Sequence, residues 1–292
     1  MRKLLLQLDT SVHPSVFDRV VAFDAGADEV MSYGGVNEDT VRDLVHGAIF
    51  TRGPKDLHHT AIFIGGTDMA AGERLLAAVR KAFFGPMRVS VMLDSNGSNT
   101  TAVAAVSKLQ QAVGSLQGLR AVVTAGTGPV GARAAGLLVM SGADVAITSR
   151  RADASAAASI GQRFGGTIRS LTMADASGAG AALAGAEVLL NAGPAGVQLV
   201  PLGAWAGTGV RAAADVNAVP PSGIEGIDVR DDGAEKEGAV VFGALGVGGL
   251  KMKIHKACIT RLFERNDLVL DAETIAEVAR TLPSKTDAPR GT

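Results

Sequence analysis

Short apolar runs alternate along the chain with longer stretches in which apolar residues recur every three or four positions. The short runs predict buried strands, and the longer spacing, as at Leu75, Val79 and Phe83, predicts the buried face of a helix. In the first part of the chain the predicted strands are residues 4–8, 28–33, 61–64 and 89–93. The predicted helices open at Pro14 and Ser15, span 37–45, follow an N-cap at Asp68 and cover 101–113.

A second series of the same kind follows a glycine-bounded junction at 114–118. Its predicted strands are residues 121–124, 145–149, 167–171, 188–191, 211–215 and 240–245. A long helix is expected from Gly248 or Gly249 to Arg265. Strands that alternate with helices form parallel sheets whose faces the helices cover, so the pattern predicts an α/β protein.

The end of the chain is expected to return to the first domain. Asp271 is a suitable cap for a last helix within 266–284. The predicted division is therefore 1–113 together with 266–284 as one domain and 114–265 as the other, with a disordered tail at 285–292.

Composition narrows the class of protein. The chain has 292 residues, 47% of them hydrophobic, which is enough for two domains with cores of their own. A formal net charge of -1 gives no electrostatic reason to expect nucleic acid or an anionic membrane as a partner. The first apolar run meets Asp9 too soon for a signal peptide, and no run approaches the roughly 20 apolar residues of a membrane span. We therefore expect a cytoplasmic protein, and its single cysteine, Cys258, excludes an intrachain disulfide.

A glycine-rich turn follows the strand predicted at 121–124. Its residues, Gly126, Thr127, Gly128, Pro129, Val130 and Gly131, fit the pattern GxGxxG between a strand and an apolar helix. Gly126 would make the tight turn, Gly128 would let the backbone approach a pyrophosphate, and Gly131 would let helix and strand pack closely. The start of the helix would supply amide donors for the phosphates. The context predicts a Rossmann-type domain that binds a dinucleotide.

The end of the next strand indicates which dinucleotide. NAD-binding domains place an acidic residue there to hold the ribose hydroxyls. Here Thr148 and Ser149 occupy that place, and Arg150 and Arg151 follow. Serine and arginine would bind the 2′-phosphate that a carboxylate would repel, so we predict NADP. The alternative is that both arginines begin a solvated helix.

Turns at the ends of later strands are further candidates for cofactor contact, because ligands of such sheets lie at the strands' carboxyl ends. The alternative for each is a tight turn without ligand. The candidates are Ala192, Gly193, Pro194, Asn217, Ala244, Leu245 and Gly246.

Longer strings of residues, spread over nearly the whole chain, carry a more specific signal: FDRVVAFDAGAD, TAIFIGGTDMAAGERL, FFGPMRVSVMLDSNGSNTT, LVMSGADV and FGALGVGGLKMKIHKACI. They closely resemble the bacterial NADP-dependent methylene-tetrahydromethanopterin dehydrogenases of one-carbon metabolism. The resemblance implies an N-terminal α/β pterin-binding domain, a Rossmann-type parallel-sheet NADP-binding domain and an active-site cleft between them. It also implies a tetrahydromethanopterin substrate, with tetrahydrofolate accepted by some members.

The reaction that this resemblance implies needs no general acid or base. Methylene-tetrahydropterin would pass a hydride to NADP and become a methenyl cation, so the protein would act by aligning the two reacting carbons. We predict no acid–base residue and no metal. His58 and His59 lack the cysteine or spaced carboxylate partners of a metal site, and Cys258 lies in an apolar helical stripe typical of packing.

A related activity is not expected. The bifunctional folate dehydrogenase/cyclohydrolases carry a Tyr-x-x-x-Lys motif for hydrolysis. The nearest segment here begins at Tyr33 and places Asn37 where the lysine would stand, so we expect no cyclohydrolase activity.

The candidate pterin-binding residues follow the strand predicted at 89–93, where polar groups could pair with the amide edge of a pterin and a carboxylate could stabilise the methenyl cation. The alternative is a loop capped by Asn99 or Thr100. Two lysines of the long helix could contact an anionic tail of the substrate, a cofactor phosphate or only solvent. The candidates are Asp94, Ser95, Asn96, Gly97, Ser98, Asn99, Thr100, Thr101, Lys253 and Lys256.

Two other functions are compatible with the same domains. The string LLNAGPAGV resembles a loop of the shikimate dehydrogenases, although Lys55 and Asp56 do not match the lysine–aspartate motif of that family. The other is a non-catalytic redox sensor that binds NADP without turnover, for which no interaction domain is evident. For an enzyme of this kind we expect a homo-oligomer.

Overall fold

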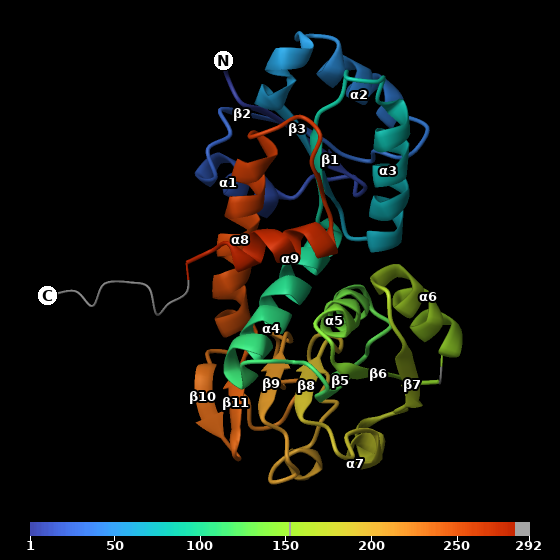
Figure 1. Cartoon of the computed structure of the whole chain (residues 1–292), viewed down its shortest axis with the longest axis vertical. Coiled ribbons are helices and arrows are strands. Elements are labelled where there is room, and N and C mark those ends of the chain that lie inside the picture. The colour runs from blue at the N-terminus through green and yellow to red at the C-terminus, as the bar shows by residue number, and fades with distance from the viewer. Residues whose placement is uncertain (152, 284–292) are drawn as a thin grey trace, which may run out of the picture. The chain divides into compact units, whose positions relative to one another are not determined.

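A computed structural model describes residues 1–151 and 153–283 (Figure 1). The chain forms two compact units, one of Met1–Thr100 together with the chain from Met252 onward, and one of Thr101–Lys251. The chain thus leaves the first unit after Thr100 and returns to it at Met252. The tail predicted to be disordered, 285–292, lies outside the described residues.

The first unit is built on a sheet of five strands, all parallel, in the order β12-β4-β3-β1-β2. β3 lies in the middle and all six of its residues are buried, which accounts for its uninterrupted apolar sequence. The strands are β1 (Leu4–Asp9), β2 (Glu29–Tyr33), β3 (Thr60–Gly65), β4 (Ser90–Leu93) and β12 (Val269–Leu270).

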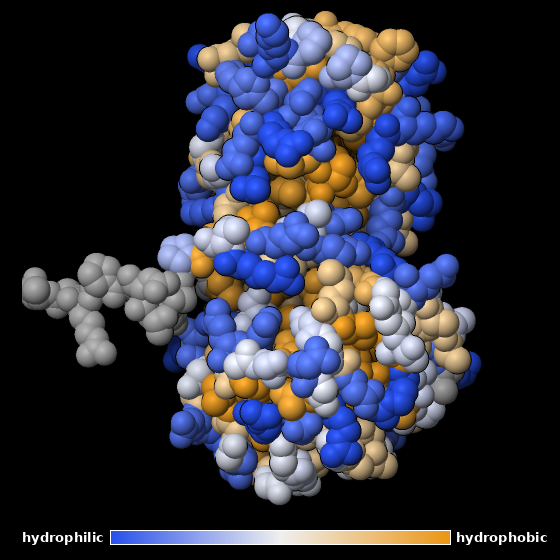
Figure 2. All heavy atoms as spheres, viewed as in Figure 1, coloured by the Kyte–Doolittle hydropathy of each residue, from blue (hydrophilic) through white to orange (hydrophobic). Residues whose placement is uncertain are grey.

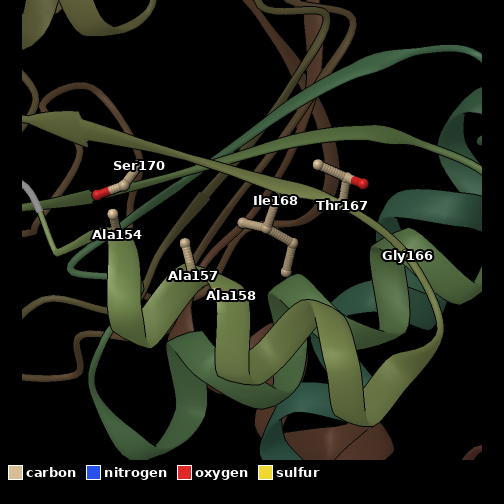
Figure 3. A pocket seen from close by; sticks show the side chains of 7 residues that line it. All are labelled: Ala154, Ala157, Ala158, Gly166, Thr167, Ile168 and Ser170. Carbon is tan, nitrogen blue, oxygen red and sulfur yellow. The ribbon is translucent and has the colours of Figure 1, made fainter.

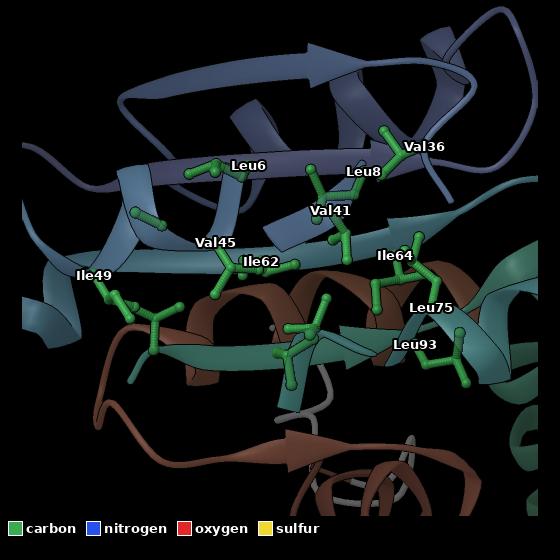
Figure 4. Packing of buried hydrophobic residues seen from close by; sticks show 14 of the residues in the cluster. Leu6, Leu8, Val36, Val41, Val45, Ile49, Ile62, Ile64, Leu75 and Leu93 are labelled. Atoms are coloured by element: carbon green, nitrogen blue, oxygen red, sulfur yellow. The ribbon is translucent and has the colours of Figure 1, made fainter. Parts of the chain in front are cut away.

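Helices pack on this sheet through their apolar faces. Figure 4 shows Val41 and Val45 of one helix and Leu75 of the next beside Ile62 and Ile64 of β3, all in one buried cluster. Side chains cap three of the helices, two of them, Asp68 and Asp271, as predicted: these two and Ser15 each accept a hydrogen bond from a backbone N–H of the first turn. The helices are α1 (Val16–Asp24), α2 (Val41–Ile49), α3 (Met69–Ala82) and α9 (Ala272–Arg280), with 3-10 turns at Pro54–His59 and Ser95–Gly97.

The second unit contains a sheet of seven strands in the order β10-β11-β9-β8-β5-β6-β7. Six are parallel, and β10 pairs with β11 in antiparallel fashion at one edge. Numbered along the chain, the parallel strands run 3-2-1-4-5-6, which is the order of a Rossmann domain. The strands are β5 (Arg120–Thr124), β6 (Asp144–Ser149), β7 (Ile168–Thr172), β8 (Val188–Asn191), β9 (Ala212–Asp215), β10 (Asp232–Lys236) and β11 (Ala239–Phe242).

The strand order reverses between β5 and β8, so the turns after these two strands flank the point at which such sheets bind their ligands. The helices of the unit are α5 (Pro129–Met140), α6 (Ala154–Phe164) and α7 (Ala179–Ala182), with 3-10 turns at Ala176–Gly178 and Leu202–Ala204. Two long helices, α4 (Ser98–Val113) and α8 (Ala244–Leu262), contain residues of both units.

Four sequence-based boundaries were wrong. The helix predicted at 37–45 begins at Val41, because the side-chain oxygen of Asn37 accepts the N–H groups of Asp39 and Thr40 and makes a turn. The strand predicted at 240–245 ends three residues earlier and the long helix starts sooner, at Ala244, while the helix predicted from Thr101 already begins at Ser98.

Hydrophilic side chains cover most of the face shown in Figure 2. Within residues 1–151 and 153–283, no helix combines the length and the apolar character needed to cross a bilayer.

Candidate functional site

The glycine turn between β5 and α5 is tightly packed at two of its three glycines. A Cβ on Gly126 would lie 2.5 Å from Cβ of Ile147 on β6, and a Cβ on Gly131 would lie 2.7 Å from the carbonyl oxygen of Ala125. Both distances are too short for any side chain. Ala125 adopts a positive φ of 51° to make the turn. The first and third glycines are therefore required by the packing of strand, turn and helix.

Gly128 is less tightly packed than Gly126 and Gly131, and this bears on whether the turn suits a dinucleotide. A Cβ there would meet only Ala125 O, at an ordinary contact distance of 3.4 Å, so packing within the protein does not demand glycine. Gly128 is the N-cap of α5 and Pro129 its first residue. The N–H groups of a first helical turn have no partner within the helix and favour anions. Glycine at this position suits a phosphate that approaches the backbone closely.

Thr148 and Ser149, at the end of β6, have different surroundings, although the sequence places both where NAD-binding domains carry an acidic residue. Thr148 is buried; its hydroxyl oxygen accepts the N–H of Ala125 at 3.3 Å and its carbonyl accepts the N–H of Gly126 at 2.9 Å. It fastens the glycine turn to β6. The Ser149 hydroxyl donates to the carbonyl of Arg151, while Arg150 and Arg151 are exposed.

A chain of buried polar side chains joins the carboxyl ends of three neighbouring strands. The Thr124 hydroxyl of β5 donates to Asn191 Oδ1 of β8 at 2.6 Å, and Asn191 Nδ2 donates to Asp215 Oδ1 of β9 at 2.7 Å. All three residues are at most 1% exposed. Asn191 Oδ1 also accepts the N–H of Gly193, so the same chain fixes the turn after β8 on which Ala192, Gly193 and Pro194 lie.

The other predicted cofactor contacts have structural tasks of their own. Asn217 is buried; its side-chain oxygen accepts the N–H groups of Gly196 and Val219, and its Nδ2 donates to Pro221 O. Ala244, Leu245 and Gly246 form the first turn of α8, where Leu245 is 58% exposed. The roles of these residues toward the cofactor stay predictions.

The predicted pterin segment, 94–101, turns most of its polar groups inward. Asp94 is 2% exposed and accepts the backbone N–H of Thr100 at 3.0 Å and its hydroxyl at 2.6 Å. Ser95, Ser98 and Asn99 donate to the carbonyls of Gly65, Ser95 and Leu93. Neither Asn99 nor Thr100 caps a helix, since both lie inside α4. In this segment Asn96 is the exposed residue, and Gly97 and Thr101 are partly buried.

Residues that the sequence did not single out lie next to Asp94. His255 of α8 is 1% exposed, with Nδ1 4.0 Å from Asp94 Oδ2. Its ring stacks on Phe63 of β3, with 5.4 Å between centroids, and lies 6.4 Å from Phe17 of α1. No local pattern in the sequence could have shown these neighbours of His255, because they come from segments far apart in the chain.

The two candidate lysines differ in their surroundings. Lys253 is exposed, whereas Lys256 Nζ forms an ion pair with Asp24 Oδ2 at 2.8 Å. Cys258, on the same helix, is fully buried, and burial together with the negative charge of Asp94 raises the pKa of its thiol far above the usual range. The burial of Cys258 and the raised pKa of its thiol both agree with the packing role predicted for this residue.

A hollow of about 390 Å³ lies between α6 and β7 (Figure 3). Alanine and glycine dominate its lining, and Thr167 and Ser170 supply its polar side chains. None of the residues that line it is ionisable. Across the part of the chain that the structure describes, no three His, Cys, Asp or Glu side chains gather as metal ligands would.

Comparison with known proteins decides the family. Residues 16–96 match the family described as methylene-tetrahydromethanopterin dehydrogenase, N-terminal. The chain is 50% identical over 285 residues to the bifunctional protein MdtA of Methylorubrum extorquens, covering 96% of this chain and 99% of that protein. The chain belongs to the methylene-tetrahydromethanopterin dehydrogenase family. A second member from the same organism, an NAD(P)-dependent methylenetetrahydromethanopterin dehydrogenase, is 33% identical and covers 92% of this chain and 95% of its own length.

Solved structures agree with this family's two-domain α/β fold. A shikimate 5-dehydrogenase from Listeria monocytogenes, in complex with shikimate and NAD, superposes with a TM-score of 0.53 at 13% identity, covering 95% of this chain and 96% of that one. An identity this low shows a shared fold and leaves the substrate to other evidence.

Proposed function

We propose that the protein catalyses the reversible dehydrogenation of methylene-tetrahydromethanopterin to the methenyl form, with direct hydride transfer to NADP. The observation that carries this is the glycine turn at the reversal point of a 3-2-1-4-5-6 sheet, in a member of the methylene-tetrahydromethanopterin dehydrogenase family. The nicotinamide ring supplies the hydride acceptor. The chain's own residues then have to hold the dinucleotide and the pterin and exclude water.

The turn and the first turn of α5 would bind the pyrophosphate through backbone N–H groups. Ser149, Arg150 and Arg151 would bind the 2′-phosphate and so favour NADP over NAD; the exposure of both arginines supports this role. The turns at 192–194, 217 and 244–246 would line the rest of the dinucleotide site. These assignments rest on the position of each turn at the carboxyl edge of the sheet.

The pterin would bind at the carboxyl edge of the first unit, around 94–101, with Lys253 and Lys256 near its anionic tail. The inward bonds of this segment suggest a division of labour. Asp94 and Thr100 would hold the loop's shape, and the exposed Asn96 would contact the substrate. The buried carboxylate of Asp94 would also favour the methenyl cation.

Three further properties belong to the same proposal. We propose that the enzyme acts in one-carbon metabolism in the cytoplasm, that it assembles as a homo-oligomer, and that methylene-tetrahydrofolate serves as a second substrate. The domain division proposed for function is 1–113 with 266–284 for the pterin and 114–265 for NADP.

One assay tests the central proposal. Purified protein is mixed with NADP and, in separate reactions, methylene-tetrahydromethanopterin, methylene-tetrahydrofolate or shikimate, and NADPH formation is followed by absorbance. We expect reduction with the methanopterin derivative, and none with shikimate. Reduction with shikimate alone, or tight NADP binding without turnover on either pterin, would overturn the proposal.

A further inference from the structure

Asp215 is a buried carboxylate at the carboxyl end of β9, in the same sheet as the glycine turn. It is 1% exposed. Its Oδ1 accepts Asn191 Nδ2 at 2.7 Å and the N–H of Asn217 at 3.0 Å, and its Oδ2 accepts the N–H of Ile224 at 3.0 Å. Both oxygens thus act as acceptors of N–H donors, as in an ionised carboxylate.

Hydrogen bonds from neutral groups stabilise this charge. Among residues 1–151 and 153–283, no cationic side chain forms an ion pair with Asp215. Arg211, just before the same strand, pairs with Glu187 at 3.8 Å, and Lys236 of β10 pairs with Asp231 at 2.7 Å. A buried charge that is solvated only by neutral dipoles acts over a longer range than a surface charge, because little water screens it.

The place of Asp215 within the sheet decides which part of a dinucleotide would feel that charge. A Rossmann domain consists of two mononucleotide-binding halves on either side of the reversal point. The half with β5, β6 and β7 carries the glycine turn and the residues proposed to bind the ribose 2′-phosphate, so this half would bind the adenosine end. The half with β8, β9 and β11 is left for the nicotinamide end, and Asp215 closes its central strand.

We propose that Asp215 is a specificity-determining residue that favours the oxidised nicotinamide over the reduced one. The oxidised ring carries a positive charge and the reduced ring is neutral, so a fixed negative charge beside the site stabilises the first and not the second. This inference rests on the proposed binding of NADP and adds to it a preference between the two redox forms. Asp215 acts through its field and through the turn that it holds.

The test is direct binding of NADP⁺ and of NADPH, measured by calorimetry at fixed pH and salt, to three forms of the full chain: wild type, Asp215→Asn and Asn191→Ala. Asp215→Asn removes the charge and disturbs the hydrogen-bonded chain, whereas Asn191→Ala disturbs the same chain and keeps the charge. Asp215→Asn should weaken NADP⁺ relative to NADPH by roughly tenfold. Asn191→Ala should weaken both forms alike and leave their ratio within about twofold.

Equal losses for NADP⁺ and NADPH in Asp215→Asn would overturn the inference, because a purely structural role does not distinguish the two forms. Should that variant fail to fold, the wild type decides by itself. If wild type binds NADP⁺ at least as tightly as it binds NADPH, the inference is supported. If it binds NADPH more than about tenfold more tightly than NADP⁺, the inference is contradicted. Wild type that binds neither form would instead overturn the proposed function, and this inference with it.

Discussion

Arg150 and Arg151 carry the prediction that is most specific at the scale of single residues. Both are exposed directly after β6, and the carbonyl of Arg151 accepts the Ser149 hydroxyl. A charge-assisted contact between arginine and phosphate contributes roughly 1.5–3 kcal/mol. NAD lacks the 2′-phosphate, so its binding does not depend on this contact.

The double variant Arg150→Ala/Arg151→Ala should therefore lower kcat/KM for NADP by about 10- to 150-fold and change kcat/KM for NAD by less than about twofold. Steady-state kinetics with both cofactors at one salt concentration measure this. Arg169→Ala is the matched control, since Arg169 is another exposed arginine of the same sheet and pairs with Asp144. Equal losses for both cofactors would mean that the pair supports the fold or the pyrophosphate.

At the scale of elements, the strand–turn–helix unit of β5 and α5 depends on close packing. Gly126→Ala would place Cβ 2.5 Å from Cβ of Ile147, which cannot move aside because it belongs to β6. We expect a loss of about 1–3 kcal/mol in the free energy of unfolding, the usual cost of overpacking, and weaker NADP binding.

Urea unfolding and NADP titration measure these two effects. Gly180→Ala is the control, because Gly180 lies in α7 with nothing within 4 Å of an added Cβ, and alanine is the better helix former. That variant should keep or slightly raise stability. A Gly126→Ala protein as stable as wild type, with unchanged NADP binding, would show that the turn relaxes more freely than its packing indicates.

At the scale of the whole molecule, the proposed chemistry needs no metal. Hydride transfer activates no water, and the described residues bring no set of metal ligands together. We expect the rate of NADP reduction to stay the same after exhaustive dialysis against a chelator. A loss of rate that added zinc or magnesium restores would contradict this prediction.

Local sequence patterns fixed much of the fold because they report which side of an element is buried. The apolar runs of β3 and β8, the caps Ser15 and Asp271, and the glycine turn after β5 all depend on neighbours close in the chain. β10 escaped prediction because its residues, DGAEK, are polar and mostly exposed, and only pairing with β11 makes them a strand.

The sequence by itself therefore indicated the α/β fold and the glycine turn between β5 and α5, and its resemblance to known proteins indicated the family. Tertiary structure decided how the polar residues are used. It turned Thr148 inward to hold the glycine turn, placed His255 beside Asp94, and joined Asp215 to Asn191 across two strands. Apolar periodicity records burial, which is a property of one position and its near neighbours, whereas the partner of a buried polar atom is set by strand order and helix packing between segments far apart in the chain.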